Sequence, residues 1–242
     1  QQLGWAVSTL LDAAGEADDD VSRLVLEIPV GVQVVGEIAK LRALRLLWAD
    51  VARERGIAGD LVVLASGPSF PMTGVDCESN LLRAALCGFA AVCGGADLVE
   101  LAPYRADGDE RLREACRLAA NQMRLMLEES HLDVVGDPWA GSDVVEHLTA
   151  RLVAAGRAEL DRLRAAGGHL AADRDGAYDT LDALQEPYAA AESRRAEGLA
   201  HRTRTVVGLN RFADPSRDRD AVLSDLPHAV FEFAEAEDVD VG

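Results

Sequence analysis

The sequence predicts an α/β fold built on a parallel sheet. Four short apolar runs, rich in β-branched residues, are each followed by a longer segment with apolar residues at helical spacing. Gly, Pro or Asp residues stand at the junctions, where turns are expected. Strands that alternate with helices in this way pair in parallel. Four such units do not close an eight-stranded barrel, so this pattern leaves half a barrel and an open sheet as alternatives.

The first elements are a helix, a strand and a longer helix. Apolar residues recur at helical spacing from Leu3 to Leu11, which predicts a helix over residues 3–15. Residues 25–30 (VLEIPV) are short, apolar and β-branched, and predict a strand. An apolar stripe predicts the next helix over residues 35–55, and Gly56 stops it.

The same alternation continues through the middle of the chain. Residues 61–65 (LVVLA) predict a second strand that runs directly into the turn-forming segment 66–69. A helix over 78–93 ends at two glycines. Residues 97–101 then predict a third strand, and residues 109–129 another helix.

Helices dominate the last third of the predicted fold. A short fourth strand is expected at residues 133–136, followed by helices over 144–166 and 178–198. A further candidate strand lies at 205–209 (TVVGL). The polar, acidic composition of residues 213–242 predicts a flexible tail.

The composition excludes several classes of protein. The 242 residues include 24 Lys+Arg and 42 Asp+Glu, and the resulting net charge of −18 argues against a nucleic-acid partner. No apolar stretch reaches the roughly 18–20 residues of a membrane span. The four cysteines form no CxxC pair, so we expect reduced, mostly buried thiols in a cytoplasmic protein. Because the chain opens at Gln1 inside a helical pattern, a fragment or processed chain is expected.

The loops that follow the strands are where a β/α fold places its functional site. The turn at 66–69 (SGPS) lacks the spacing of a phosphate-binding loop, so a plain tight turn is favoured. Glu100 lies within an apolar strand, where it is either a buried carboxylate or, as we favour, paired or solvated. Glu128, Glu129 and His131 match no zinc pattern, and a histidine at a helix C-terminus is the simpler account. No catalytic residue and no metal ligand is predicted.

Several segments together resemble one family, the cobalamin-dependent acyl-CoA mutases, and methylmalonyl-CoA mutase above all. The similarity runs in order from about residue 2 to residue 212. It is carried by Glu37 to Trp48 (EIAKLRALRLLW), Gly94 to Asp97 (GGAD), Glu128 to Leu132 (EESHL), Asp137 to Ser142 (DPWAGS), Val145 to Thr149 (VEHLT) and Val207 to Asn210 (VGLN).

The resemblance implies a fold and a chemistry. Residues 1–212 would form the C-terminal half of a (β/α)8 TIM barrel with a helical extension. In that family adenosylcobalamin starts a radical carbon-skeleton rearrangement of an acyl-CoA, such as methylmalonyl-CoA to succinyl-CoA. The first half of the barrel and the cobalamin domain would lie outside this sequence.

The positions that would face substrate or cofactor depart from the family pattern. The substituted strand-end positions that match the family's site are Ser66, Ser69, Cys87, Asp97 and Glu100. Cys87 stands where catalytic members carry a glutamate near the cofactor, and Asp97 and Glu100 replace a glutamine and a histidine. A retained scaffold with altered strand ends resembles the small, non-catalytic subunit of a heterodimeric mutase.

The leading hypothesis is therefore a scaffolding subunit, inactive alone, whose large partner subunit binds adenosylcobalamin and acyl-CoA. Two alternatives remain open. The chain is a catalytic barrel portion of another cobalamin-dependent acyl-CoA mutase, with altered specificity, or a non-enzymatic half-barrel binding module.

Overall fold

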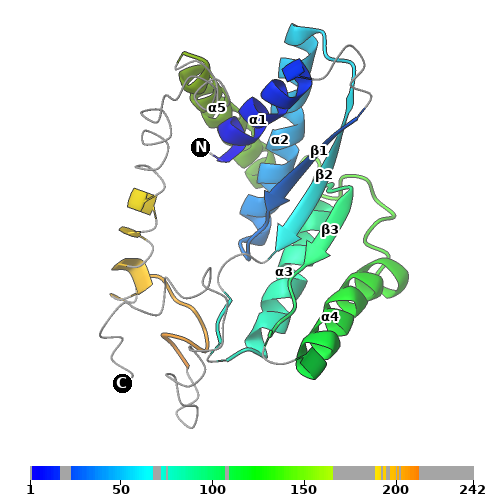
Figure 1. The fold of residues 1–242 in the computed structure, drawn as a ribbon, viewed down its shortest axis with the longest axis vertical. Helices are drawn as coiled ribbons and strands as arrows, with labels where there is room; N and C mark the ends of the chain where they lie inside the picture. Colours follow the sequence, from blue (N-terminus) through cyan, green and yellow to red (C-terminus); the bar gives the residue numbers. More distant parts are fainter. Residues whose placement is uncertain are drawn as a thin grey trace.

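The fold is described by a computed structural model (Figure 1). The described residues are 2–16, 23–67, 72–74, 76–106, 109–165, 189–191, 193–194, 197–199, 201 and 203–212. The helix predicted over 178–198 lies mostly outside them, although the described residues between 189 and 199 are helical. The predicted tail, 213–242, lies wholly outside them.

A three-stranded parallel sheet forms the centre of the described fold. Its strands are β1 (Arg23–Pro29), β2 (Asp60–Gly67) and β3 (Leu98–Leu101), in the order β1-β2-β3. Each strand pairs with the next in parallel register. The predicted α/β class, the parallel pairing and the first three strands are therefore confirmed.

The predicted helices are also present over the described residues. They are α1 (Gln2–Glu16), α2 (Val34–Arg55), α3 (Ser79–Cys93), α4 (Asp109–Arg124) and α5 (Asp143–Ala165). The last turn of the helix predicted over 109–129 is a π-helix, η1 (Leu125–Glu129). Gly56 ends α2 in the left-handed conformation, with φ of 70°, as the stop signal predicts. Among these helices none is long and apolar enough to cross a membrane.

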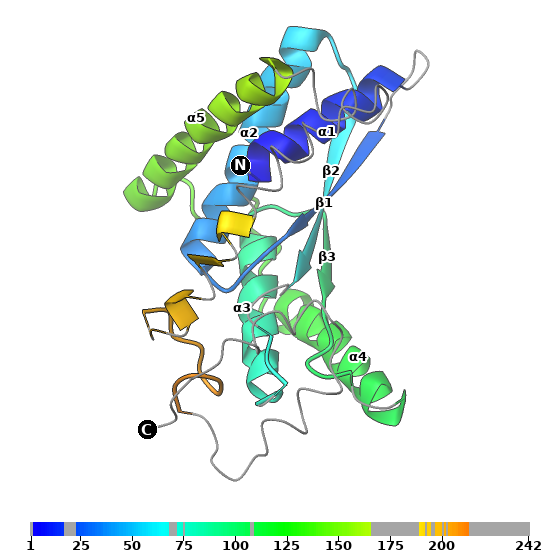
Figure 2. The same ribbon diagram turned by 60° about the vertical axis from the view of Figure 1, so that its left-hand side comes forward.

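The core lies between the sheet and the helices on one of its faces. Ile28, Val63 and Ala65 point toward α2 and α3 and are almost fully buried. Figure 2 views the sheet nearly edge-on, with α2 and α3 on one side of it. Helices α1 and α5 pack on α2 from outside, and Trp5 Nε1 of α1 donates to Glu159 Oε1 of α5 at 2.8 Å.

The opposite face of the sheet is open over the described residues. Val25 of β1 is 61% exposed and Leu98 of β3 is 53% exposed, although both are large and apolar. Parallel sheets are almost always covered on both faces, because their strands are buried between two layers. The described residues supply only one of those layers.

Two predicted strands are wrong. Residues 133–136 form turns and bends, with the Val134 N–H donating to the carbonyl of His131 at 3.3 Å. Residues 205–209 belong to a turn whose only ladder contact in the described chain is a single bridge between Val207 and Arg211. Both segments are β-branched and apolar, but a strand also needs a neighbour to pair with, and local hydrogen bonds occupy their backbones instead.

Candidate functional site

The carboxyl ends of the strands bring two of the predicted site residues together on the open face. Ser66 of β2 stands beside Glu100 of β3 in the parallel register, and Pro29 of β1 completes the same row. Ser66 is half-buried and Glu100 is exposed, as the solvated alternative for this carboxylate predicted. A hydroxyl and a carboxylate therefore lie side by side at the edge where β/α folds place their ligands.

Below this row the open face is mainly apolar. The next row contains Glu27, Leu64 and Leu98, and Val25 pairs with Val62 one row further down. Since these side chains are bulky, they leave no channel of small polar residues along the middle of the face. In a closed barrel such rows become the layers that fill the interior.

Cys87 lies on the other side of the sheet. Its side chain is 1% exposed, and its Cβ lies 3.6 Å from where a Cβ on Gly67 would stand. Burial, reinforced by the nearby Glu37 carboxylate, raises the pKa of the Cys87 thiol to about 12. The thiol is therefore neutral and packed in the core, and the sheet separates it from Ser66 and Glu100.

Lys40 and Glu37, which were not among the predicted site residues, lie at the carboxyl end of β1. Lys40 Nζ donates to the carbonyl of Pro29 at 2.6 Å and lies 2.5 Å from Glu37 Oε2. Both side chains come from the first turns of α2 and are mostly shielded from solvent. The signal for them was the family-like motif EIAK, which places them one turn apart on the same helix.

Asp97 lies away from this edge, immediately before β3. Asp97 Oδ2 accepts from the Val63 N–H at 2.7 Å and from Arg45 Nη2 at 2.7 Å. Burial alone would raise its pKa, but these hydrogen bonds hold the pKa of the carboxyl below its ordinary value. The residue therefore braces the sheet rather than joining Ser66 and Glu100, and Ser69 lies outside the described residues.

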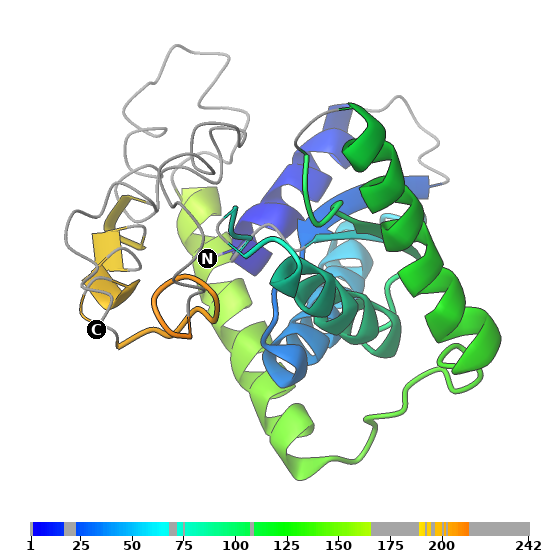
Figure 3. The ribbon, with the colours of Figure 1, turned by 90° about the horizontal axis from the view of Figure 1, so that it is seen from below.

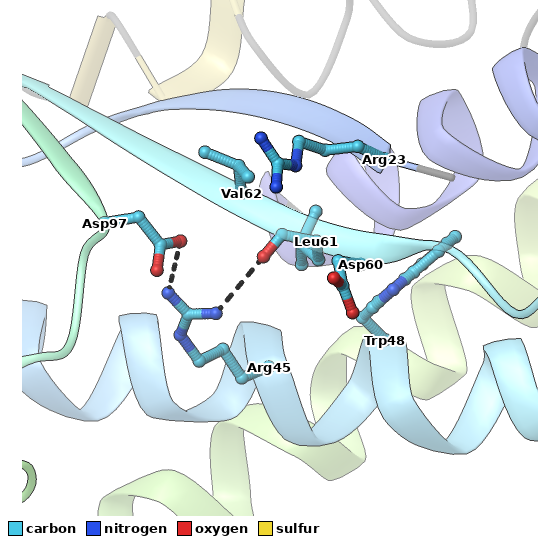
Figure 4. Close-up of a pocket in the computed structure, with 7 residues that line it drawn as sticks. All are labelled: Arg23, Arg45, Trp48, Asp60, Leu61, Val62 and Asp97. Atoms are coloured by element: carbon cyan, nitrogen blue, oxygen red, sulfur yellow. Dashed lines mark hydrogen bonds and ion pairs between the residues drawn. The ribbon is translucent and has the colours of Figure 1, made fainter. Parts of the chain in front are cut away.

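A cavity of about 410 Å³ surrounds this brace (Figure 4). It is lined by Arg23, Arg45, Trp48, Asp60, Leu61, Val62 and Asp97. Arg45 also donates to the carbonyl oxygens of Gly95 and Leu61, so its guanidinium is already occupied by the protein. The cavity adjoins the start of β2, at the end of the sheet opposite to the predicted site.

Arg42 joins α2 to the segment before α5. It donates to Asp137 Oδ2 at 3.1 Å, to Glu146 Oε1 at 2.8 Å and to Thr149 Oγ1 at 3.4 Å. The Glu146 carboxylate also accepts from the N–H of Gly141 at 3.0 Å, which secures the start of α5. The conspicuous acidic residues of this region thus hold elements together. Across the described ranges, no three His, Cys, Asp or Glu side chains gather where they could hold a metal ion.

Comparisons with known proteins agree on one family. A family model described as methylmalonyl-CoA mutase matches residues 6–240. A probable methylmalonyl-CoA mutase small subunit of Mycobacterium tuberculosis is 37% identical over 187 residues, covering 72% of this chain and 28% of the relative.

Two further relatives extend the comparison. The methylmalonyl-CoA mutase small subunit of Streptomyces virginiae is 37% identical over 179 residues, with the same coverage of 72% and 28%. The methylmalonyl-CoA mutase of Escherichia coli is 28% identical over 226 residues, covering 90% of this chain and 30% of the relative. The chain thus spans about 30% of the length of these relatives. It belongs to the methylmalonyl-CoA mutase family.

Proposed function

We propose that this chain is part of the non-catalytic small subunit of a methylmalonyl-CoA mutase-type isomerase. Residues 1–212 would form the C-terminal half of a (β/α)8 barrel with its helical extension, and residues 213–242 a separate tail. A large partner subunit would carry the chemistry in the cytoplasm. The relatives named as small subunits support this assignment.

The open sheet face supports the half-barrel. Val25 and Leu98 are more than half exposed on a parallel sheet that has helices on its other face. Their burial would be completed by further strands that close the sheet around them, since closure both covers that face and removes the free edges. The longer relatives have the chain length to supply those strands.

The observation that carries the non-catalytic role is the set of side chains on this face. Val25, Val62, Leu64 and Leu98 would project into the barrel and fill its middle. An acyl-CoA chain threaded through the barrel would meet these apolar side chains, together with the Glu27 carboxylate of the same face, instead of an open channel.

The described residues also do not fit adenosylcobalamin. Cys87, at the position matched to the family's cofactor-side glutamate, is buried behind the sheet as a neutral thiol. The described strand ends offer Ser66 and the exposed Glu100, and the Lys40 ammonium at the end of β1 is already held by Glu37 and the Pro29 carbonyl. We therefore assign cofactor and acyl-CoA binding to the partner subunit.

The decisive experiment is purification of the full-length protein with and without a large mutase subunit produced in the same cells. We expect a stable complex in which only the large subunit binds corrinoid, and in which activity falls when the small subunit is withheld. Full mutase activity of the large subunit alone would contradict the scaffolding role.

A catalytic role is the second candidate, and the adjacency of Ser66 and Glu100 favours it. These two side chains lie in one row at the ligand edge of the sheet. If they bind substrate, Glu100→Ala would abolish cobalamin-dependent turnover in the purified complex, whereas the scaffolding role predicts unchanged turnover. A protein that purifies alone, colourless and self-associated would instead favour the half-barrel binding module.

A further inference from the structure

Residues 203–212, here called the C-terminal strap, form a turn that is braced by one buried side chain. Asn210 is 6% exposed, and its Oδ1 accepts from the N–H of Val206 at 2.8 Å. Its Nδ2 donates to the carbonyl of Leu199 at 3.0 Å and to that of Arg204 at 2.8 Å. With every polar atom of its amide group engaged, Asn210 gives the strap a defined shape of its own.

The strap is docked beside the start of α3, at the carboxyl end of the sheet (Figures 1 and 3). Arg83 of α3 donates through Nη2 to the carbonyl of Val207. Gly208 has φ of 79°, and a Cβ built on it would collide with both the Cβ and the carboxylate of Asp76. The backbone of the strap at Gly208 therefore lies so close to Asp76 that only glycine fits at this position.

Arg83 continues the contact inward. It is 8% exposed, and its Nη1 donates to Asn80 Oδ1 at 2.7 Å. Asn80 is 2% exposed; its Nδ2 donates to the carbonyl of Thr73 at 2.8 Å and to that of Tyr104 at 3.0 Å. Asn80 Oδ1 also accepts from the N–H of Thr73 at 3.1 Å.

These bonds form one connected path. It leads from the strap through Arg83 to Asn80, and from there to the segment that follows β2 and the segment that follows β3. Segments at the carboxyl ends of parallel strands are where α/β folds hold their ligands. The strap is thus linked to the ligand edge although it lies about 100 residues later in the sequence.

We propose that the C-terminal strap is a latch on the ligand edge of the sheet. Docked, it supplies an acceptor to the buried guanidinium of Arg83, which in turn fixes Asn80 and the two segments that Asn80 joins. Undocked, it leaves Nη2 of that guanidinium without its carbonyl partner, and because an unmade hydrogen bond on a buried charged group is costly, Arg83 and Asn80 rearrange and release Thr73 and Tyr104. This inference rests on the described hydrogen bonds and not on the proposed catalytic or scaffolding role.

The test is hydrogen exchange of single backbone amides in the full-length protein carrying Gly208→Ala. The added methyl group collides with Asp76 and undocks the strap, so we expect the amides of Leu209, Asn210 and Thr73 to exchange about tenfold faster or more, and together. Amides in the middle of α2 keep their wild-type rates. Faster exchange in the strap with an unchanged Thr73 amide would overturn the latch, because the strap would then pack passively.

Two further variants separate the collision from backbone strain. Gly141→Ala is the matched control, since Gly141 has φ of 78° with no atom within 4 Å of the new Cβ. It should leave the strap and Thr73 unchanged. Asp76→Gly combined with Gly208→Ala removes the colliding Cβ and carboxylate together and should restore slow exchange at both places. Failure of that double variant to restore it would count against docking through this contact.

Arg83→Lys tests the path itself, should Gly208→Ala fail to fold. A lysine keeps the positive charge but lacks the fork that reaches both Val207 and Asn80. We expect faster amide exchange at Thr73 and in the strap, with the melting temperature of the protein unchanged. Wild-type protection at both places would contradict the proposal.

Discussion

At the scale of single residues, Asp97 and Arg45 make hydrogen bonds to the backbone of β2 that a longer β3 would otherwise make. Strand β3 begins opposite Leu64, so the described residues supply no neighbouring strand on that side to the part of β2 before Leu64. The Asp97 carboxylate accepts the Val63 N–H, and Arg45 donates to the Leu61 carbonyl at 3.4 Å. The sequence marks Asp97 as part of a family-like GGAD motif and as a substituted position of the family's site, but nothing in its spacing predicts a backbone partner.

Asp97→Ala should therefore lower the free energy of unfolding by about 1 kcal/mol, because it leaves the Val63 N–H and one Arg45 donor unpaired. The pKa of Asp97 is lowered in the folded state, so its contribution is complete at pH 6 and fades as the pH falls below about 4. Urea unfolding at several pH values measures both effects. Asp60→Ala is the control: Asp60 lines the same cavity, and its side chain makes no hydrogen bond or ion pair with the other lining residues (Figure 4). An equal loss in both variants would contradict the bracing role.

The thiols give a second prediction at this scale. Cys77, Cys87 and Cys93 are buried, whereas Cys116 on α4 is exposed. Because burial raises the pKa of the Cys87 thiol to about 12, hardly any thiolate is present there at pH 8. We expect iodoacetamide to modify Cys116 in the native protein and Cys87 only after unfolding, as measured by peptide mass spectrometry. Rapid native modification of Cys87 would show that it faces solvent, as a ligand-site residue would.

At the scale of elements, the helices could be predicted and the weaker strands could not. The apolar residues of α2 recur along one stripe, and Gly56 sets its end through a local conformational preference. Residues 133–136 show two valines in a row, but a strand depends on a distant partner that composition does not reveal. At 205–209 the deciding group is Asn210, whose amide binds the backbone and favours a turn.

Arg42 gives the prediction for elements, since its hydrogen bonds join α2 to both the turn before α5 and the first turns of α5. Arg42→Met should lower the free energy of unfolding by about 1–3 kcal/mol, because three polar groups lose a charged donor. Arg53→Met is the matched control on the same helix. The exposed Arg53–Asp50 pair contributes at most about 0.5 kcal/mol. Chemical denaturation compares the two, and equal losses would refute the joining role.

At the scale of the whole molecule, the sequence predicted a sheet of parallel strands but not that one face would lie bare. The open face follows from the absence of further strands among the described residues, and burial can be judged only when the layers are assembled. The predicted site residues lie in separate places, and this too can be judged only when the layers are assembled. Ser66 and Glu100 share a face and a row, Cys87 faces the other way, and Asp97 belongs to the brace beside the cavity.

The bare face predicts a difference between two equally exposed leucines. Leu98 on the sheet and Leu46 on α2 are both 53% exposed. If closure of a barrel buries the sheet face, Leu98→Gln should cost the full-length protein about 2 kcal/mol or more, and Leu46→Gln less than about 0.5 kcal/mol. Thermal unfolding of the full-length variants measures this. Equal, small effects would mean that the face stays in water.

The pairing of Lys40 with Glu37 and the Pro29 carbonyl has a practical consequence, because Lys40 is the sole lysine of this sequence. An amine-directed reagent has one side chain to modify here, and that ammonium is held by two acceptors at the end of β1. Its acylation rate therefore reports how often the contacts of Lys40 with Glu37 and with the Pro29 carbonyl open. The same measurement can be made on the free protein and on any assembly that it enters, with no engineered label.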